Sequence, residues 1–352
     1  MMKLKSGAEL IKFHNWGYRP GFILGISMKE FEILKQKIPG VRRDVPLKDH
    51  TTFKIGGPAK YFFVAKTSKD IVKAVSVARD LKLPFFLLSG GSNVLASDDG
   101  FSGLVVKIQN TKYKIPFDFA QGKQTTKVWA EAGVSMATLV RETGKLGLAG
   151  LEWAGGLPGT VGGAVRGNAG AFGGEIKDAI AQVEAIDEEG KRKTFSQKEC
   201  TFGYRSSIFK EKNMVVLEAT FQLRKGERKE IQAVAKDHMR YRKERHPLEY
   251  PNAGSIFKNC NVKKVPKELA EILKDVIKMD PFPVIPTAAI LARAKLQGLR
   301  VGDAQISEKH PNYIVNRGNA RAKEVLQLIE DVKKRIKKQF GIELEEEISF
   351  PH

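Results

Sequence analysis

Two glycine-rich segments carry the clearest chemical signal in this sequence. Nine of the twenty residues in GGLPGTVGGAVRGNAGAFGG (155–174) are glycine, and a second cluster lies in LSGGSNVL (88–95). Glycine-rich turns let several backbone N–H groups converge on one anion, and they let the backbone approach a flat ring or a pyrophosphate closely. Together the two segments favour a site for an extended dinucleotide, with a pair of tight structural turns as the alternative.

Known phosphate-binding motifs do not account for either segment. No Gly-Lys-Ser/Thr follows at the spacing of a P-loop, and neither segment is a clean Gly-x-Gly-x-x-Gly at the start of a βαβ unit. A Rossmann-type site is therefore disfavoured. Ser92, Asn93, Thr160 and Asn168 add neutral hydrogen-bonding groups to the two segments.

The elements that must position these segments are a mixture of strands and helices. Apolar runs predict strands at 60–65, 83–88, 103–108, 126–133, 180–187 and 214–224. Helical periodicity predicts a helix at 68–82 capped by Ser68, another capped by Ser135, and a long one at 320–340. The long helix has one apolar side, made of Val325, Leu328, Ile329, Val332, Ile336 and Phe340. A strand is expected in IELEEEISF at the end of the chain, and a polar, patternless loop at 111–127.

The alternation of these elements is not strictly βαβ, so an α+β fold is expected rather than a doubly wound parallel sheet. The predicted divisions are an extension at 1–27, subdomains at 28–110 and 111–226, and a further domain at 227–342. The terminal strand at 343–350 is expected to join the first subdomain.

Composition narrows the class of protein. Among 352 residues there are only two cysteines, Cys200 and Cys260, and the six histidines have no metal-ligand spacing, so neither a disulfide framework nor a metal site is expected. No apolar run approaches the length of a membrane span and the first residues do not resemble a signal peptide, so we expect a cytoplasmic protein.

The formal net charge of +20 favours anionic partners, although a lysine-rich surface is an equally good explanation. No nucleic-acid-binding motif is present, and aromatic residues do not alternate with the basic runs. We therefore expect anionic small molecules as partners, and neither nucleic acid nor membranes. A monomer is expected separately, without support from the charge.

Six motifs, in order, resemble the UDP-N-acetylenolpyruvoylglucosamine reductase (MurB) family over residues 46–350: HTTFKIGGPAKYF, SGGSNVL, GLPGTVGGAVRGNAGAFGGEIKD, CTFGYRSSIFK, AGSIFKN and ISEKHPNYIVNRGNA. The resemblance implies an FAD-binding domain of the vanillyl-alcohol-oxidase (PCMH) type in two subdomains, followed by an α+β substrate domain. It also implies NADPH-dependent reduction of UDP-N-acetylglucosamine enolpyruvate to UDP-N-acetylmuramate, for peptidoglycan synthesis.

Three catalytic residues follow from the resemblance. Arg205 in FGYRSS matches the family's arginine, whose guanidinium suits a substrate carboxylate that gains negative charge. Ser255 in AGSIFKN matches the serine that donates a proton to carbon. Glu347 matches the C-terminal glutamate, with Glu345 and Glu346 left open by spacing alone. Each has a simpler alternative: a surface ion pair, a turn cap and a solvated acidic run.

The resemblance also implies binding residues. Substrate contacts are expected from Tyr204, Lys258, Asn259, His310 and Asn312, although a lone histidine is as often structural. FAD contacts are expected from Ser89, Gly90, Gly91, Ser92, Asn93, Gly156, Gly159, Thr160, Gly162, Gly163, Asn168, Ala169 and Gly170. Neither glycine segment contains a histidine, so the FAD is expected to be non-covalent.

The sequence departs from the family pattern at three places. Ser89 stands where a third glycine is common, Cys260 stands where proline is usual, and the segment 261–297 is longer than expected. The tyrosine-bearing insertion of one family subtype is not recognisable, so the chain is closer to the subtype without it. The rival hypotheses are another flavin oxidase of the same fold and a non-enzymatic anion or nucleic-acid binder.

Overall fold

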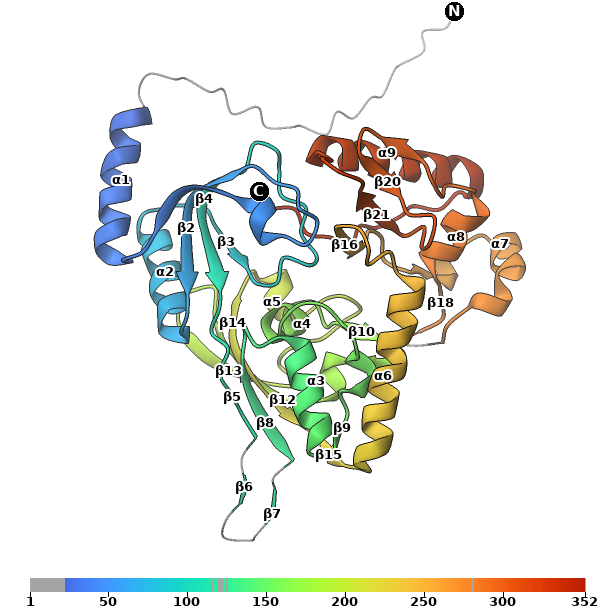
Figure 1. The fold of residues 1–352 in the computed structure, drawn as a ribbon, viewed down its shortest axis with the longest axis horizontal. Helices are drawn as coiled ribbons and strands as arrows, with labels where there is room; N and C mark the ends of the chain where they lie inside the picture. The colour runs from blue at the N-terminus through green and yellow to red at the C-terminus, as the bar shows by residue number, and fades with distance from the viewer. Residues whose placement is uncertain (1–22, 116, 119–122, 125, 280–281, 352) are drawn as a thin grey trace, which may run out of the picture.

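The protein is described from a computed structural model, which covers residues 23–115, 117–118, 123–124, 126–279 and 282–351. Most of the predicted extension at 1–27 lies outside the described residues. Helix α1 (Ile23–Lys37) begins ahead of the predicted boundary at 28. It lies beside the first sheet at one end of the molecule (Figure 1).

A four-stranded sheet holds the first glycine segment. Its order is β1-β2-β4-β3, with β2 and β3 parallel to β4 and β1 antiparallel to β2. The strands are β1 (Arg42–Pro46), β2 (Pro58–Ala65), β3 (Phe85–Leu88) and β4 (Phe101–Ile108). The predicted strands at 60–65, 83–88 and 103–108 are thus present, and the segment 89–93 directly follows β3.

The prediction that Ser68 caps the helix at 68–82 is wrong by one residue. Helix α2 (Ser68–Asp80) already includes Ser68. The N-cap is Thr67, not Ser68: the Thr67 hydroxyl accepts from the Asp70 N–H, and the Asp70 carboxylate accepts from the Thr67 N–H. Ser68 is instead buried, and its hydroxyl accepts a hydrogen bond from Asn110. Ser135, in contrast, caps α3 (Met136–Lys145) as predicted.

Removal of this cap gives a testable stability difference. Thr67→Ala is expected to lower the free energy of unfolding by about 1 kcal/mol, because it leaves the Asp70 N–H in the first turn without its partner. Thr67→Ser keeps the hydroxyl and should retain nearly all the stability in a urea titration. Equal stability of the alanine and serine variants would contradict the capping role.

A five-stranded antiparallel sheet of order β13-β12-β14-β8-β5 carries the second glycine segment. Its strands are β5 (Tyr113–Lys114), β8 (Lys127–Glu131), β12 (Ile180–Ile186), β13 (Arg192–Ser196) and β14 (Val215–Gln222). The prediction of a plain loop at 111–127 is wrong in part, since β5 pairs with β8, and β6 (Phe117–Asp118) pairs with β7 (Lys123–Gln124). Strands of two residues are too short to show an alternating pattern.

Short elements lie between and after these strands in the chain. They are α4 (Val161–Arg166), α5 (Ile208–Glu211), β9 (Leu148–Ala149), β10 (Gly170–Ala171), β11 (Gly174–Glu175) and β15 (Arg224–Lys225). Of these, α4, α5 and β10 contribute residues to the cavity described below. Helix α6 (Arg228–Arg245) then crosses from this region to the C-terminal part of the chain (Figure 1).

The C-terminal part is an α+β unit built on a sheet of order β16-β21-β20-β19. Its elements are β16 (Asn252–Ser255), β17 (Cys260–Asn261), α7 (Lys267–Ile272), β18 (Val284–Ile285), α8 (Thr287–Arg293), β19 (Arg300–Val301), β20 (Ala304–Ile306), β21 (Tyr313–Asn316) and α9 (Ala322–Phe340). The predicted apolar side of α9 is confirmed: Val325, Leu328, Ile329, Val332 and Ile336 are buried, and Phe340 is partly buried.

The predicted strand at 343–350 is wrong as a continuous element. In this segment only two isolated bridges are assigned, from Glu346 to Phe257 and from Ser349 to Val94. Its alternating Ile342, Leu344 and Ile348 side chains are nevertheless buried in the C-terminal core. The segment therefore connects β16 to the first glycine segment instead of extending one sheet.

Hydrophobic packing forms three cores in the described residues, one of them within 45–105, and the predicted division of the chain stays a prediction. One large core contains residues from Leu34 to Leu223, and so joins elements on both sides of position 110. The C-terminal core extends from Ala253 to Ile348 and also includes Phe53, Ile55 and Leu95. Contacts from the first sheet to the C-terminal part thus place the two glycine segments and β16 around a common space.

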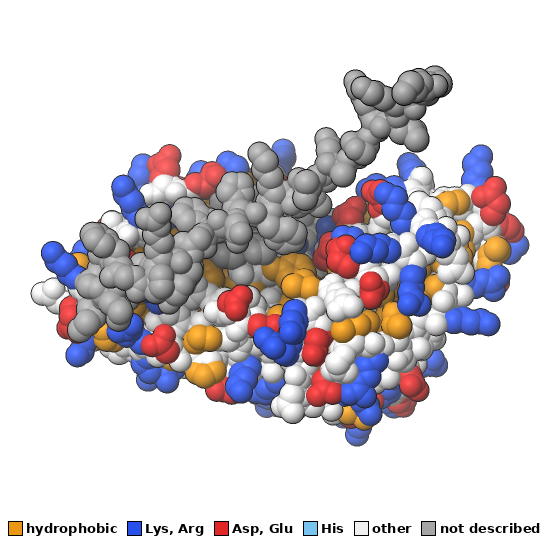
Figure 2. Space-filling model, turned by 90° about the horizontal axis from the view of Figure 1, so that it is seen from above, with side chains coloured by type: hydrophobic (Ala, Val, Ile, Leu, Met, Phe, Trp, Pro, Cys, Tyr) orange, Lys and Arg blue, Asp and Glu red, His pale blue; other side chains and the backbone are white. Residues whose placement is uncertain are grey.

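The charge of the molecule is spread out on the face that Figure 2 shows. Lysine and arginine side chains lie among acidic ones there and do not gather in a single patch. Within the described residues, no helix has the length and apolar character needed to cross a bilayer.

Candidate active site

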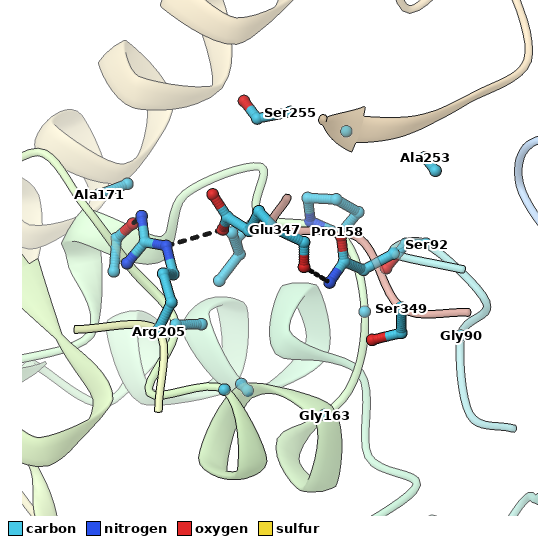
Figure 3. A pocket seen from close by; sticks show the side chains of 18 of the residues that line it. Gly90, Ser92, Pro158, Gly163, Ala171, Arg205, Ala253, Ser255, Glu347 and Ser349 are labelled. Carbon is cyan, nitrogen blue, oxygen red and sulfur yellow. Dashed lines mark hydrogen bonds and ion pairs between the residues drawn. The ribbon is translucent and has the colours of Figure 1, made fainter. Parts of the chain in front are cut away.

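A cavity of about 920 Å³ lies between the two glycine segments and the C-terminal unit. Ser255, at the end of β16, lies on one side of it, and Gly163 in α4 lies on the other, with Arg205 and Glu347 between them in this view (Figure 3). Eleven of the thirteen predicted FAD contacts line this cavity: Ser89, Gly90, Gly91, Ser92, Asn93, Gly159, Thr160, Gly162, Gly163, Ala169 and Gly170.

The two glycine segments touch each other. A Cβ atom on Gly90 would lie 3.1 Å from the Cα of Gly159, which is tighter than ordinary contact. The hydroxyl groups of Ser89 and Thr160 share a hydrogen bond, and Lys107 donates to the Ser89 carbonyl over 2.6 Å. Ser89, the departure from the usual glycine, therefore links the two segments.

Gly156 and Asn168 are not among the described residues that line the cavity. Asn168 is fully buried, where its amide donates to Gly203 and Glu175 and accepts from the Lys177 N–H. Both the nitrogen and the oxygen of the Asn168 amide therefore have hydrogen-bond partners within the protein. Gly156 packs behind the wall against Met239 and Arg242 of α6, where a Cβ would lie 3.1 Å from the Arg242 Cδ.

Arg205 and Glu347, 142 positions apart, meet at the cavity. Arg205 Nε donates to Glu347 Oε1 over 2.7 Å, and its Nη2 donates to the Gly170 carbonyl over 2.9 Å. Burial disfavours the charged guanidinium, but Glu347, with Tyr204 and Glu175 adding to its effect, outweighs burial and raises the pKa of Arg205. The Arg205 backbone has φ 55°, a left-handed conformation in a tight turn between Gly203 and Ser206.

The three adjacent glutamates point to different partners. Glu345 pairs with Lys258 and Lys264, and Glu346 pairs with Lys333. Glu347 pairs with Arg205 and lines the cavity. Its carbonyl also accepts a hydrogen bond from Asn93 of the first glycine segment, drawn as the second dashed line in Figure 3.

The five predicted substrate residues separate into two groups. Asn259, His310 and Asn312 line the cavity. The Asn312 amide is engaged twice by the Phe257 backbone, at 2.8 and 3.0 Å, so it holds the chain that follows Ser255. Burial and, to a smaller extent, Lys278 lower the pKa of His310 to about 4, although a backbone hydrogen bond opposes this shift.

Tyr204 and Lys258 are not among the described lining residues. The Tyr204 hydroxyl accepts a hydrogen bond from the Asn259 N–H, and its ring packs edge-on against Phe282. Lys258 pairs with Glu345 over 3.2 Å. Both side chains thus support the residues beside the cavity.

The long segment 261–297 contributes to the cavity wall. Cys260 and Asn261 in β17 pair with β18, and Lys278, Pro286 and Ala288 line the cavity. Burial raises the pKa of the Cys260 thiol, which favours its neutral form.

Several lining residues carry charge or a titratable group that the sequence analysis did not single out. They are Arg166, Lys210, Asp237, His238, Arg240, Tyr241, Arg242, Glu244, His246, Lys278 and Tyr313. Most come from α6 and β21, and only the fold brings these elements to the glycine segments. The basic run in α6 was the one available signal, but its charge alone does not distinguish cavity side chains from solvated ones. No cluster of three or more possible metal ligands occurs in the part of the chain that is described.

Comparison with known proteins agrees with this geometry. A family described as FAD binding domain matches residues 59–196, and one described as UDP-N-acetylenolpyruvoylglucosamine reductase, C-terminal domain, matches residues 246–351. These matches confirm the predicted α+β fold class of an FAD-binding domain followed by a C-terminal domain.

Individual relatives cover nearly the whole chain. UDP-N-acetylenolpyruvoylglucosamine reductase of Caldanaerobacter subterraneus is 36% identical over 90% of this chain and 97% of its own. The Clostridium novyi reductase is 38% identical over 88% and 91%. The crystal structure of MurB from Thermus caldophilus matches with a TM-score of 0.67 and 31% identity, over 88% of this chain and 99% of that one. The chain therefore belongs to the UDP-N-acetylenolpyruvoylglucosamine reductase (MurB) family.

Proposed function

We propose that this protein is a UDP-N-acetylmuramate dehydrogenase that reduces UDP-N-acetylglucosamine enolpyruvate in peptidoglycan precursor synthesis. The observation that carries the proposal is the meeting of Ser255, Arg205 and Glu347 at a cavity walled by two glycine segments. Membership of the family agrees with this activity, since the relatives carry the reductase name.

The glycine segments fit a flat, extended cofactor. Gly163 lines the cavity, and the nearest atom that a Cβ there would meet is the Thr160 hydroxyl oxygen at 3.9 Å, so the absent side chain leaves room. Ser92, Asn93 and Thr160 offer hydrogen-bonding groups on the same wall. These residues would hold FAD, which when bound accepts a hydride from NADPH and passes it to the enolpyruvyl group.

The side chains supply the remaining chemistry. Arg205 binds the substrate carboxylate, because a fixed guanidinium offers two parallel donors to a group whose negative charge grows during reduction. Ser255 donates the proton that the substrate carbon needs after hydride addition. Glu347 orients the Arg205 guanidinium through the 2.7 Å ion pair and faces the same cavity.

Positive side chains around the cavity suit the binding of two polyanionic molecules, NADPH and the UDP-sugar. Arg166, Lys210 and Lys278 line it, and burial, with Lys258 and Arg166 adding to the effect, lowers the pKa of Lys210. Asn259 and His310 line the cavity and would contact the UDP-sugar, while Tyr204 bonds to Asn259 and Lys258 pairs with Glu345 beside them. A monomeric, cytoplasmic enzyme with non-covalent FAD and a preference for NADPH remains the expectation.

A single added methyl group tests the cofactor site. Gly163→Ala is expected to weaken FAD binding by about 1–3 kcal/mol, because the methyl group occupies cavity space. Gly144→Ala in α3 is the matched control, since its Cβ would make ordinary contacts of 3.6–3.7 Å with Ile231 and Gln232, away from the cavity. Both variants should fold, and isothermal titration of the apoprotein with FAD should separate them; equal affinities would contradict this placement.

The proposed activity is tested with the purified protein. It should be yellow, should release FAD on denaturation, and should oxidise NADPH only when UDP-N-acetylglucosamine enolpyruvate is present. Mass spectrometry should then find UDP-N-acetylmuramate. A colourless protein that gains no flavin on reconstitution, or a yellow one that oxidises NADPH without forming this product, would contradict the proposal.

A further inference from the structure

Three polar side chains that belong to different elements form a continuous row at the Ser255 side of the cavity. Ser255 at the end of β16 is paired with Tyr313 at the start of β21, so the two side chains share one face of the antiparallel pair. The Tyr313 hydroxyl lies 3.0 Å from Nδ1 of His246. All three residues line the cavity.

The position of His246 is fixed by the fold. It is the C-cap of α6, where its N–H donates to the Arg242 carbonyl over 2.9 Å. Its ring packs against the rings of Tyr313 and His310, with centroids 5.1 and 5.3 Å apart. His246 and Ser255 are half-buried while Tyr313 is buried, so the row runs from one partly exposed group to another through a buried phenol.

The electrostatic setting keeps this row uncharged. Burial lowers the pKa of His246 to about 4, with His310 and Arg242 adding to the effect. Burial raises the pKa of Tyr313 to about 12, partly offset by Arg242 and by a hydrogen bond with Ser255. At neutral pH the imidazole, the phenol and the serine hydroxyl are therefore all neutral hydrogen-bonding groups.

Arg242 is placed to support a brief negative charge on the row. Its side chain is buried, its Nε donates to the Gly155 carbonyl, and its Nη2 has no hydrogen-bond partner among the described residues. The guanidinium lies over the Phe172 ring and stabilises the ionised form of Tyr313.

We propose that Tyr313 and His246 form a proton relay that supplies Ser255 during reduction of the substrate. A serine alkoxide is too basic to be left behind at neutral pH, so the proton must be replaced as it leaves. This role rests on the proposed function. Tyr313 and His246 act through Ser255 and are therefore positioning residues.

The proton transfers balance as follows. The bond between the Ser255 oxygen and its proton breaks as the new C–H bond forms on the substrate. The Tyr313 hydroxyl proton passes to the Ser255 oxygen, and the Nδ1 proton of His246 passes to the Tyr313 oxygen. The Nε2 atom of His246 takes a proton from water, so the ring stays neutral and only its tautomer changes. One solvent proton is consumed for each hydride delivered.

Substitution of the phenol and of the imidazole tests the relay. Tyr313→Phe removes one oxygen, and His246→Gln keeps a polar side chain that cannot pass a proton between two nitrogens. In anaerobic single-turnover mixing, each variant is expected to reoxidise its flavin with the enolpyruvyl substrate about 10- to 100-fold more slowly. Reduction by NADPH should keep its wild-type rate.

The solvent isotope dependence separates a relay from a structural effect. Rates in H₂O–D₂O mixtures should curve for the wild type, because several protons move together, and should become linear in both variants. Tyr61→Phe is the matched control: it also removes a hydrogen-bonded hydroxyl from a buried tyrosine, 2.6 Å from Glu30, in the first sheet away from the cavity. It should leave the rates and the curvature unchanged.

A second measurement does not depend on turnover. In ¹⁵N NMR of the FAD-loaded protein, the relay predicts a protonated His246 Nδ1 whose shift changes in Tyr313→Phe and not in Tyr61→Phe. An unchanged His246 signal, or variants that lose both half-reactions equally, would overturn the relay. If the signal shifts but the wild type does not turn over the UDP-sugar, the proposed function fails, and with it the relay's catalytic role.

Discussion

Replacement of Ser255 with alanine is expected to slow reduction of the enolpyruvyl substrate by about 10²- to 10⁴-fold, the usual contribution of a positioned general acid. The Ser255 hydroxyl, the proposed proton donor, belongs to a residue that lines the cavity at the end of β16, and alanine removes it with little change in volume. Reduction by NADPH uses no proton from Ser255, so it should stay near the wild-type rate. Anaerobic stopped-flow measurement of each half-reaction checks this separation.

The matched control for this variant is Ser196→Ala. Ser196 is exposed at the end of β13, where its hydroxyl bonds to Glu199. It should change neither half-reaction. Equal losses in both half-reactions of Ser255→Ala would refute the role of Ser255 as proton donor.

The second large effect is expected at Arg205. Arg205→Lys should lower kcat/KM for the UDP-sugar by about 10²- to 10³-fold, as for loss of one donor to a charge that develops in the transition state. Lysine keeps the positive charge, but its three N–H donors share one nitrogen and lack the planar fork of a guanidinium. With a shorter reach from one nitrogen, it should not reproduce the bonds of Arg205 to Glu347 and the Gly170 carbonyl together with the proposed paired contact to the substrate carboxylate.

Arg192→Lys is the control for this substitution. Arg192 also pairs with glutamates, Glu184 and Glu218, but its side chain is half exposed on β13. Its replacement should leave kcat/KM unchanged, because exposed pairs contribute little. A wild-type kcat/KM in Arg205→Lys would show that positive charge alone suffices and that the guanidinium geometry has no role.

Much of the fold could be predicted because local patterns and tertiary structure agree. Hydrophobic periodicity and helix-capping preferences involve only a few neighbouring residues. They predict the apolar strands of the first sheet, the Ser135 cap and the buried side of α9. One error arose where two local choices are nearly equal, whereas those at 111–127 and 343–350 depend on which segments pair in the fold. Thr67 and Ser68 are adjacent candidates for one cap, and only the reciprocal bond with Asp70 selects Thr67.

The candidate site was predictable where glycine or a family motif marks it, and not elsewhere. Spacing left three adjacent glutamates open, whereas the structure gives each a different partner and only Glu347 the contact with Arg205. Tyr313 and His246 are 67 positions apart, and their contact depends on where α6 ends relative to β21. No pattern within either segment encodes that relation.

The most direct test of the central claim is sequential anaerobic mixing, followed at the flavin absorption band. The cavity bounded by residues 89–93, the tract at 157–172 and Ser255 should hold FAD that both reactants reach. NADPH should bleach the band, and UDP-N-acetylglucosamine enolpyruvate, added next without oxygen, should restore it with formation of UDP-N-acetylmuramate. A band that NADPH bleaches but the enolpyruvyl sugar does not restore would contradict the account.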